Sequence, residues 1–125
     1  DHVWHRGLWF AYKFVNGVNF WEENEAHGVQ RGEGPVSVDA DGARARLIQR
    51  LLWQAPDGAV PLEETRRLEL ARPDGGELSI TWRAELRARG RVVLDRTPFT
   101  TWGGYGGLAF RASREWHEAQ LLGPK

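Results

Sequence analysis

The 125-residue sequence contains no cysteine and no methionine. The lack of cysteine excludes disulfide bonds, thiolate nucleophiles and zinc–thiolate sites, although it leaves the cellular compartment open. The lack of methionine leaves no initiator residue before Asp1, so we expect the chain to be a fragment of a longer protein. Its length is that of one ordinary domain, and we expect residues 1–125 to form a single, partial domain.

The formal net charge is zero, because seventeen basic residues balance seventeen acidic residues. No run of five like charges occurs, so the chain lacks a basic surface for a phosphate backbone, and we expect no nucleic acid partner. No apolar run approaches the roughly 20 residues that cross a bilayer, so we expect a soluble chain without a membrane partner. The P-loop and the G-x-S-x-G elbow are absent as well.

Hydrophobic alternation predicts an all-β protein. In the range 78–87, apolar residues at even positions alternate with polar residues at odd positions, which is the clearest strand pattern in the chain. We expect Trp82 in this strand to lie in the core. The range Leu8 to Val15 is apolar on both faces, as in a central strand, and Phe14 is also expected in the core. The dipeptide Asn16-Gly17 then predicts a hairpin with residues 18–21.

The range Ala43 to Ala55 gives two conflicting signals. Its apolar residues form a stripe at the helical period of 3.6, yet two Pro-Asp-Gly turns follow, at residues 56–58 and 73–75. These turns separate three segments of similar length. We therefore predict a β-meander of residues 43–55, 60–71 and 78–87 within an antiparallel β-sandwich.

The other segments carry weaker signals. We expect residues 22–33 to form a loop that contains at most one short strand, residues Val36 to Val38 to form a short strand, and residues 92–101 to form a strand that is interrupted by Pro98. Ser113 is a candidate cap of a short helix that reaches His117.

The opening ten residues hold the densest group of chemically active side chains. His2 and His5 lie three positions apart, beside several aromatic residues. Three interpretations stay open: a metal site completed by a residue such as Glu22 or His27, a catalytic or ligand-binding histidine without metal, and purely structural histidines.

Twelve of the fourteen aromatic residues lie in residues 1–21 or 99–116. We therefore expect the opening segment and the glycine-rich loop from Trp102 to Arg111 to lie side by side, because glycine permits close approach. An indole or phenol face can pack against the C–H face of a sugar while polar groups bind its hydroxyls. The predicted substrate-binding residues are Trp4, Trp9, Trp102, Tyr105 and Arg111.

Four motifs resemble the PmoA-like family, a largely uncharacterised family named after a methane oxygenase subunit, and they extend over essentially the whole chain. They are Asp1-His2-x-x-His5-Arg6-Gly7-Leu8-Trp9-Phe10-Ala11, Val15-Asn16-Gly17-Val18-x-Phe20-Trp21, Leu52-Trp53-x-Ala55-Pro56-Asp57-Gly58 and Gly104-Tyr105-Gly106-Gly107-Leu108-x-Phe110-Arg111.

The resemblance implies a longer parent and part of a galactose-mutarotase-like supersandwich, in which a histidine acts as an acid beside aromatic walls. By this resemblance His2 or His5 is the catalytic acid, and Arg6 holds an anionic or hydroxyl group.

The leading functional hypothesis is a carbohydrate-active or carbohydrate-binding β-sandwich. One alternative is a metal-dependent oxidoreductase that uses His2 and His5. The other is a non-catalytic interaction module whose edges pair with the remainder of the parent chain. The sequence names no cofactor, and whether the protein is an enzyme stays open.

Overall fold

The computed structural model describes residues 7–72, 76–97, 106–113, 115–116, 120 and 122–123. These residues form strands and no helix, so none of them builds a helix that could cross a membrane. All the strand pairs are antiparallel, which confirms the predicted fold class. The strands are β1 (Leu8–Tyr12), β2 (Phe14–Val15), β3 (Val18–Asn19), β4 (Val29–Ala40), β5 (Arg44–Gln54), β6 (Leu62–Ala71), β7 (Ser79–Ala88), β8 (Leu94–Asp95) and β9 (Gly106–Phe110).

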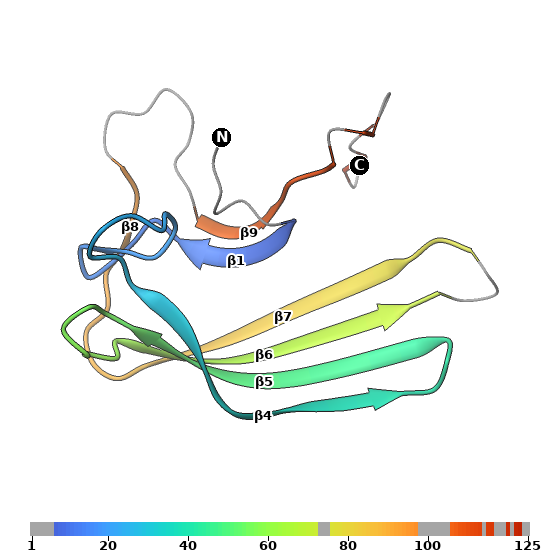
Figure 1. The fold of residues 1–125 in the computed structure, drawn as a ribbon, viewed down its shortest axis with the longest axis horizontal. Helices are drawn as coiled ribbons and strands as arrows, with labels where there is room; N and C mark the ends of the chain where they lie inside the picture. Colours follow the sequence, from blue (N-terminus) through green and yellow to red (C-terminus); the bar gives the residue numbers. More distant parts are fainter. Residues whose placement is uncertain are drawn as a thin grey trace.

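The strands form three sheets that are arranged as a sandwich. The largest sheet has the order β4-β5-β6-β7, and the smaller sheets are β1-β9 and β3-β2-β8. The β1-β9 ribbon lies over one half of the four-stranded sheet, and β8 lies at the same end (Figure 1). The other half of the large sheet extends beyond β1 and β9 to the turn between β4 and β5. We call this half the far end of the sheet.

The core lies between β1 and the covered half of the large sheet. Trp53 of β5 is fully buried, and the rings of Phe10, Tyr12 and Phe20 surround it at centroid distances of 6.2, 6.3 and 5.3 Å. Burial of such large rings supplies most of the apolar area that a small core removes from water. The buried cluster consists of Ala11, Val15, Phe20, Trp21, Trp53 and Leu62.

The predicted meander is confirmed, including the segment that had a helical stripe. β5 pairs with β6 from Arg44↔Ala71 to Trp53↔Leu62, and β6 pairs with β7 from Leu62↔Ala88 to Ala71↔Ser79. β5 also pairs with β4 on its other side. The two ladders on either side of β5 therefore outweigh the local helical preference of residues 43–55, even though the β4–β5 register shifts between Glu33 and Ser37.

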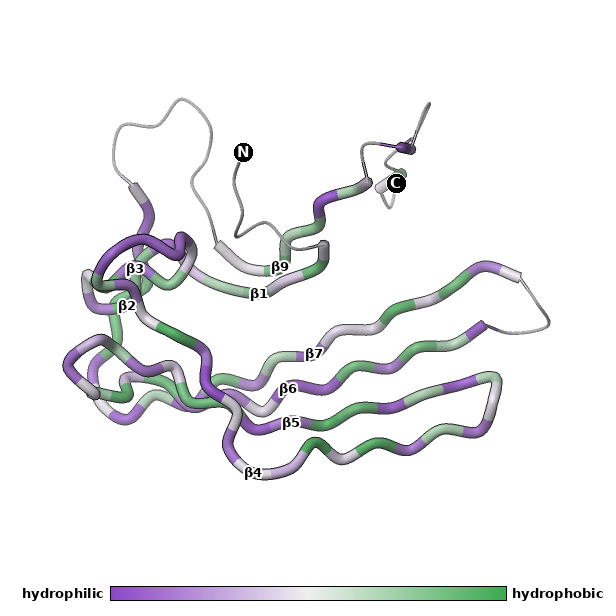
Figure 2. Tube along the Cα trace, viewed as in Figure 1, coloured by the Kyte–Doolittle hydropathy of each residue, from purple (hydrophilic) through white to green (hydrophobic). Residues whose placement is uncertain are grey.

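The two faces of the large sheet differ in polarity, as the alternating colours along β5 to β7 show (Figure 2). The inner face, which β1 covers in part, carries the register row Leu47, Leu68 and Trp82. The outer face carries cross-strand ion pairs, with N–O distances of 3.1 to 3.2 Å. These pairs are Arg46–Glu69, Arg67–Glu85 and Arg50–Glu33.

The predicted hairpin at Asn16-Gly17 is present. Both residues have positive φ, 51° and 79°, as a two-residue turn that matches strand twist requires. Asn16 also ties the hairpin to β8, because its Oδ1 accepts a hydrogen bond from the Val93 amide at 2.8 Å. In the glycine-rich segment the constraint is close packing, because a Cβ atom at Gly106 would lie 3.2 Å from the Tyr12 ring.

Two strand boundaries were wrong. The range Leu8 to Val15 is not one central strand: it bends at Lys13, and its two halves enter different sheets. At this position the buried Lys13 ammonium pairs with Glu22, and the Lys13 carbonyl accepts a hydrogen bond from the Phe20 amide, so both groups contact the loop after β3. Residues 29–33 of the expected loop over 22–33 instead belong to β4, which also contains the expected short strand at 36–38. The exposed side chains of β4 hide its pairing with β5 from a hydrophobicity pattern.

Several smaller predictions also need correction. Phe14 and Trp82 are half-buried and are not members of the buried core. The strand expected over residues 92–101 is reduced to β8, and residues 98–101 lie outside the described residues. Ser113 Oγ accepts from the Glu115 amide at 3.2 Å, but the described residues there form a turn and no helix; His117 lies outside them.

We predict that Trp53→Ala lowers the free energy of unfolding by about 3–5 kcal/mol, because it removes the ring that joins the two layers. Urea denaturation measures this loss. The matched control is Trp116→Ala, which changes a ring that is 58% exposed and should cost less than about 1 kcal/mol. Equal losses in the two variants would contradict the assignment of Trp53 to the core.

We also predict that Arg89→Gln raises the pKa of Glu63. A hydrogen bond from Arg89 Nε to Glu63 Oε1, at 2.6 Å, holds the pKa of this carboxyl below its usual range. The stabilisation is present above the unfolded-state pKa and is lost as the pH falls through the lowered folded-state pKa. NMR titration of the Glu63 carboxyl measures the change; a titration unaltered by Arg89→Gln would show that this hydrogen bond does not form in solution.

Candidate functional site

A cavity of about 390 Å³ lies between β1, the segment that joins β3 to β4, and the inner face of the large sheet. Its size falls within the range of small-molecule sites. Residues from four strands and one loop line it. They are Leu8, Trp9, Phe10, Ala11, Phe20, Trp21, Glu22, Glu23, His27, Gly28, Val29, Gln30, Arg66 and Trp82.

Three indole rings contribute to the wall of this cavity. Trp9 and Trp21 pack edge to face, with their centroids 5.4 Å apart and an interplanar angle of 65°. Trp21 is buried and Trp9 is half-buried, so the pair is held in place while part of Trp9 stays accessible. Trp82 contributes from β7 and is half-buried.

A partly buried polar network centred on Gln30 joins three strands at this cavity. Gln30 Nε2 donates to the Phe10 carbonyl at 2.7 Å, and Arg66 Nη2 donates to Gln30 Oε1 at 2.6 Å. Gln30 therefore connects the backbone of β1 to a side chain of β6. Because both ends of the amide are bonded, its orientation is fixed.

Two hydrogen bonds to Glu64 hold the Arg66 guanidinium in place. Arg66 Nε donates to Glu64 Oε1 at 2.7 Å, and Arg66 Nη2 donates to Glu64 Oε2 at 3.0 Å. The second oxygen also accepts from Trp53 Nε1 at 2.9 Å. The Glu64 side chain is fully buried, whereas 17% of the Arg66 side chain is exposed. A bidentate pair of this kind fixes the plane of the guanidinium.

Trp82 lies against this pair. The Arg66 guanidinium carbon is 4.8 Å from the centroid of the Trp82 ring, within the range of a cation–π contact. Trp82 Nε1 is buried and has no hydrogen-bond partner among the described residues. An unpaired buried donor costs about 1–3 kcal/mol, so this atom is a candidate contact for a ligand acceptor.

The loop between β3 and β4 brings acidic groups and an imidazole to the rim. Asn19 Oδ1 accepts from the amides of Trp21 and Glu22, at 2.9 and 3.1 Å, which folds the loop into a turn. His27 Nδ1 contacts the Asn24 carbonyl, so the neutral ring keeps its lone pair on Nε2. Gly28 packs directly against the Phe20 ring, and a Cβ atom there would clash.

The structure locates two of the predicted site residues. Trp9 lines the cavity. Arg111 is half-buried and lies outside the cavity lining; its amide donates to the Gly7 carbonyl at 2.8 Å. The other predicted residues lie outside the described residues: they are His2, Trp4, His5, Arg6, Trp102 and Tyr105.

The expected proximity of the two aromatic segments is confirmed where the structure describes them. β1 and β9 pair from Leu8↔Phe110 to Tyr12↔Gly106, so residues about one hundred positions apart are hydrogen-bonded neighbours. The prediction that His2 or His5 faces a concavity stays a prediction.

Sequence reasoning missed the polar residues of the large sheet. Gln30 fell in an expected loop, and Trp82 was assigned to the core. Glu64 and Arg66 did leave a signal, because they occupy the same strand face as Leu62 and Leu68. Two charges on the apolar face of a strand indicate a buried pair or a site.

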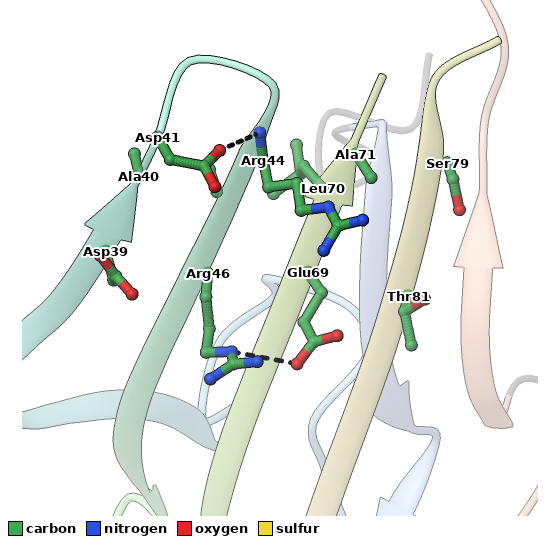
Figure 3. Close-up of a pocket in the computed structure, with 11 residues that line it drawn as sticks. Asp39, Ala40, Asp41, Arg44, Arg46, Glu69, Leu70, Ala71, Ser79 and Thr81 are labelled. Carbon is green, nitrogen blue, oxygen red and sulfur yellow. Dashed lines mark hydrogen bonds and ion pairs between the residues drawn. The ribbon is translucent and has the colours of Figure 1, made fainter. Parts of the chain in front are cut away.

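A second hollow of about 370 Å³ lies at the far end of the sheet. Figure 3 shows one ion pair in it, between Arg46 and Glu69 at 3.1 Å, and the Asp41 carboxylate accepting a hydrogen bond from the Arg44 amide at 2.9 Å. Its lining contains no aromatic ring. This hollow is therefore a weaker candidate for a ligand site. Among the described residues, no group of three or more His, Asp or Glu side chains is placed to hold a metal ion.

We predict that Glu64→Leu lowers the free energy of unfolding by about 3–5 kcal/mol, because it leaves the Arg66 guanidinium without its counter-charge. The double variant Glu64→Leu with Arg66→Leu should recover much of this loss, since a buried ion pair can be replaced by apolar side chains at little cost. The matched control is Glu69→Leu on the outer face of β6, which breaks an exposed ion pair and should cost less than about 1 kcal/mol. Denaturant unfolding of the wild type, Glu64→Leu, Arg66→Leu, their double variant and the Glu69→Leu control tests the pair. Simple additivity of the losses in Glu64→Leu and Arg66→Leu would contradict it.

Comparison with known proteins places the chain in a family. Searches of the curated proteins and of the solved structures gave no match. A family model described as a family of unknown function (DUF6807) matches residues 1–124. Because the match covers almost the whole sequence, the chain belongs to the DUF6807 family.

Proposed function

We propose that this protein is a carbohydrate-binding β-sandwich and that the sugar occupies the cavity between β1 and the large sheet. The observation that carries the proposal is the combination, in one cavity, of indole rings with fixed hydrogen-bonding groups. Trp9 and Trp82 supply flat apolar faces. Arg66 supplies a donor that is held in one orientation by Glu64 and Gln30.

These groups match the chemistry of a pyranose. One face of the ring presents C–H groups, which pack on an aromatic surface, and the edge presents hydroxyls that both donate and accept. Arg66 can donate to such a hydroxyl, and the carboxylates of Glu22 and Glu23 at the rim can accept from one.

We extend the proposal to catalysis on the basis of the resemblance to PmoA-like proteins and galactose-mutarotase-like sandwiches. In this proposal His2 or His5 transfers a proton to or from the sugar oxygen, and Arg6 holds a neighbouring group. His27 is the competing candidate, because its imidazole lines the cavity. Replacement of each histidine by glutamine separates them, since only the catalytic change abolishes turnover while binding is kept.

A panel of monosaccharides and disaccharides tests the binding proposal, first by thermal shift and then by isothermal titration calorimetry. We expect at least one sugar to bind, and Trp9→Ala to weaken it about tenfold through loss of a stacking face. Trp116→Ala is the matched control: its ring is exposed outside the cavity lining, and the change should leave binding unaltered. Circular dichroism verifies that both variants are folded.

Other outcomes would favour the alternatives. If no sugar binds and a chelator abolishes activity, the metal-dependent oxidoreductase that uses His2 and His5 becomes the better proposal. If neither effect is seen, an interaction module is favoured, because apolar side chains are exposed on the inner face at the far end of the sheet. They are Val38 at 63%, Leu78 at 50% and Ile80 at 47% exposure.

A further inference from the structure

We propose that the protein forms a symmetric dimer in which β7 pairs antiparallel with β7 of a second copy, with Ala84 opposite Ala84. The large sheet of one copy then continues into that of the other. This inference goes beyond the proposed carbohydrate site, because it concerns the edge of the sheet and not the cavity. It rests on the pairing, the charge pattern and the exposure of β7.

The large sheet has two edge strands, β4 and β7 (Figure 1). β7 pairs with β6 over its whole length of ten residues without a register shift, and no strand among the described residues pairs with its other edge. That edge therefore presents a row of backbone N–H and C=O groups that have no strand partner there. A regular edge of this kind is a template for pairing with another chain.

The other edge strand, β4, has the features that discourage such pairing. Its register with β5 shifts between Glu33 and Ser37. The shifted part contains Pro35, which has no N–H to donate, and Gly34, whose φ is 74°. Bulges and prolines interrupt an edge and hinder the addition of a strand. β7 contains neither proline nor glycine over Ser79–Ala88, so it is the edge suited to pairing.

The outer face of β7 is complementary in charge to itself. With the two-fold axis at Ala84, Arg83 of each copy lies directly opposite Glu85 of the other, since paired residues of an antiparallel ladder share a face. Arg83 is exposed and makes no ion pair among the described residues. Glu85 pairs with Arg67 of β6 at 3.1 Å, and its two oxygens allow it to accept from a second arginine. The dimer therefore gains two cross-strand ion pairs.

The inner face of β7 fits the same register. Trp82 lies opposite Leu86, and Ile80 lies opposite Ala88, so apolar residues meet apolar residues on this face. Ile80 is 47% exposed at the far end of the sheet. Because the two strands run in opposite directions, the far end of one copy lies beside the covered end of the other. The pairing therefore gives the exposed Ile80 side chain an apolar cross-strand neighbour.

Nearby registers oppose like charges or mix the two faces. A shift by one residue places outer-face residues opposite inner-face residues. With the axis at Arg83, this arginine lies opposite itself. With the axis at Glu85, Arg83 lies opposite Arg87. Like charges directly opposite each other destabilise a strand pair, so the charge pattern favours the axis at Ala84.

Sedimentation velocity of the wild-type protein over a concentration series tests the dimer. We expect a monomer–dimer equilibrium with a Kd on the order of 10 μM, because one strand pair buries less area than a standard interface. A series from about 1 to about 500 μM brackets this value. A protein that stays monomeric throughout the series would overturn the proposal.

Charge reversal tests the register. Arg83→Glu places carboxylates opposite each other, and Glu85→Arg does the same with guanidinium groups, so each variant alone should dimerise at least about tenfold more weakly than the wild type. An equimolar mixture of the two variants should recover the wild-type Kd, because each carboxylate of one variant then faces a guanidinium of the other. Arg31→Glu is the matched control: it reverses an exposed charge on β4 and should leave dimerisation unchanged.

Amide hydrogen exchange of the wild type at low and high protein concentration locates the interface. Alternate amides of β7 should become more protected at high concentration, because they donate across the new ladder, and the amides of β4 should not change. Protection of β4 instead, or a mixture of the charge variants that does not dimerise, would place the contact elsewhere and overturn the proposal. A monomeric longer protein that contains this chain would also overturn it, since another segment would then cover β7.

Discussion

The structure depends on the contacts of one indole, that of Trp53. The rings of Phe10 and Tyr12 from β1, and of Phe20 from the loop after β3, pack around it. Trp53 therefore joins the β1-β9 sheet to the large sheet. Its Nε1 atom donates to Glu64, which in turn holds Arg66. The same side chain therefore fixes the core and the polar wall of the cavity.

The buried carboxylate of Glu64 is costly for stability, because a charge loses its hydration in the interior. Three hydrogen bonds, from Trp53 and Arg66, offset that cost. Apolar residues at positions 64 and 66 would fill the same space without the cost of dehydrating a charge, as Leu62 and Leu68 do on the same strand face. The pair instead holds the Arg66 guanidinium in a fixed position, with Gln30 as its second partner, in the wall of the cavity.

The cavity could be predicted from the sequence only in part. The concentration of aromatic residues at the two ends predicted that β1 and β9 would be neighbours, and Trp9 was identified as a wall residue. Gln30, Arg66 and Trp82 were missed, because each reaches the cavity through a strand register that links positions far apart in the sequence. A hydrophobicity pattern gives the face of a residue, but it does not give what lies opposite that face.

The sequence by itself determined the fold class, the meander and the Asn16-Gly17 hairpin, because turn residues and alternation act locally. The tertiary structure decided two things: that the opening strand divides at Lys13, and that Arg66 of β6, held by Glu64, meets Gln30 of β4. The physical reason is that ladder pairing, burial of an ion pair and long-range hydrogen bonds depend on partners that no local pattern specifies.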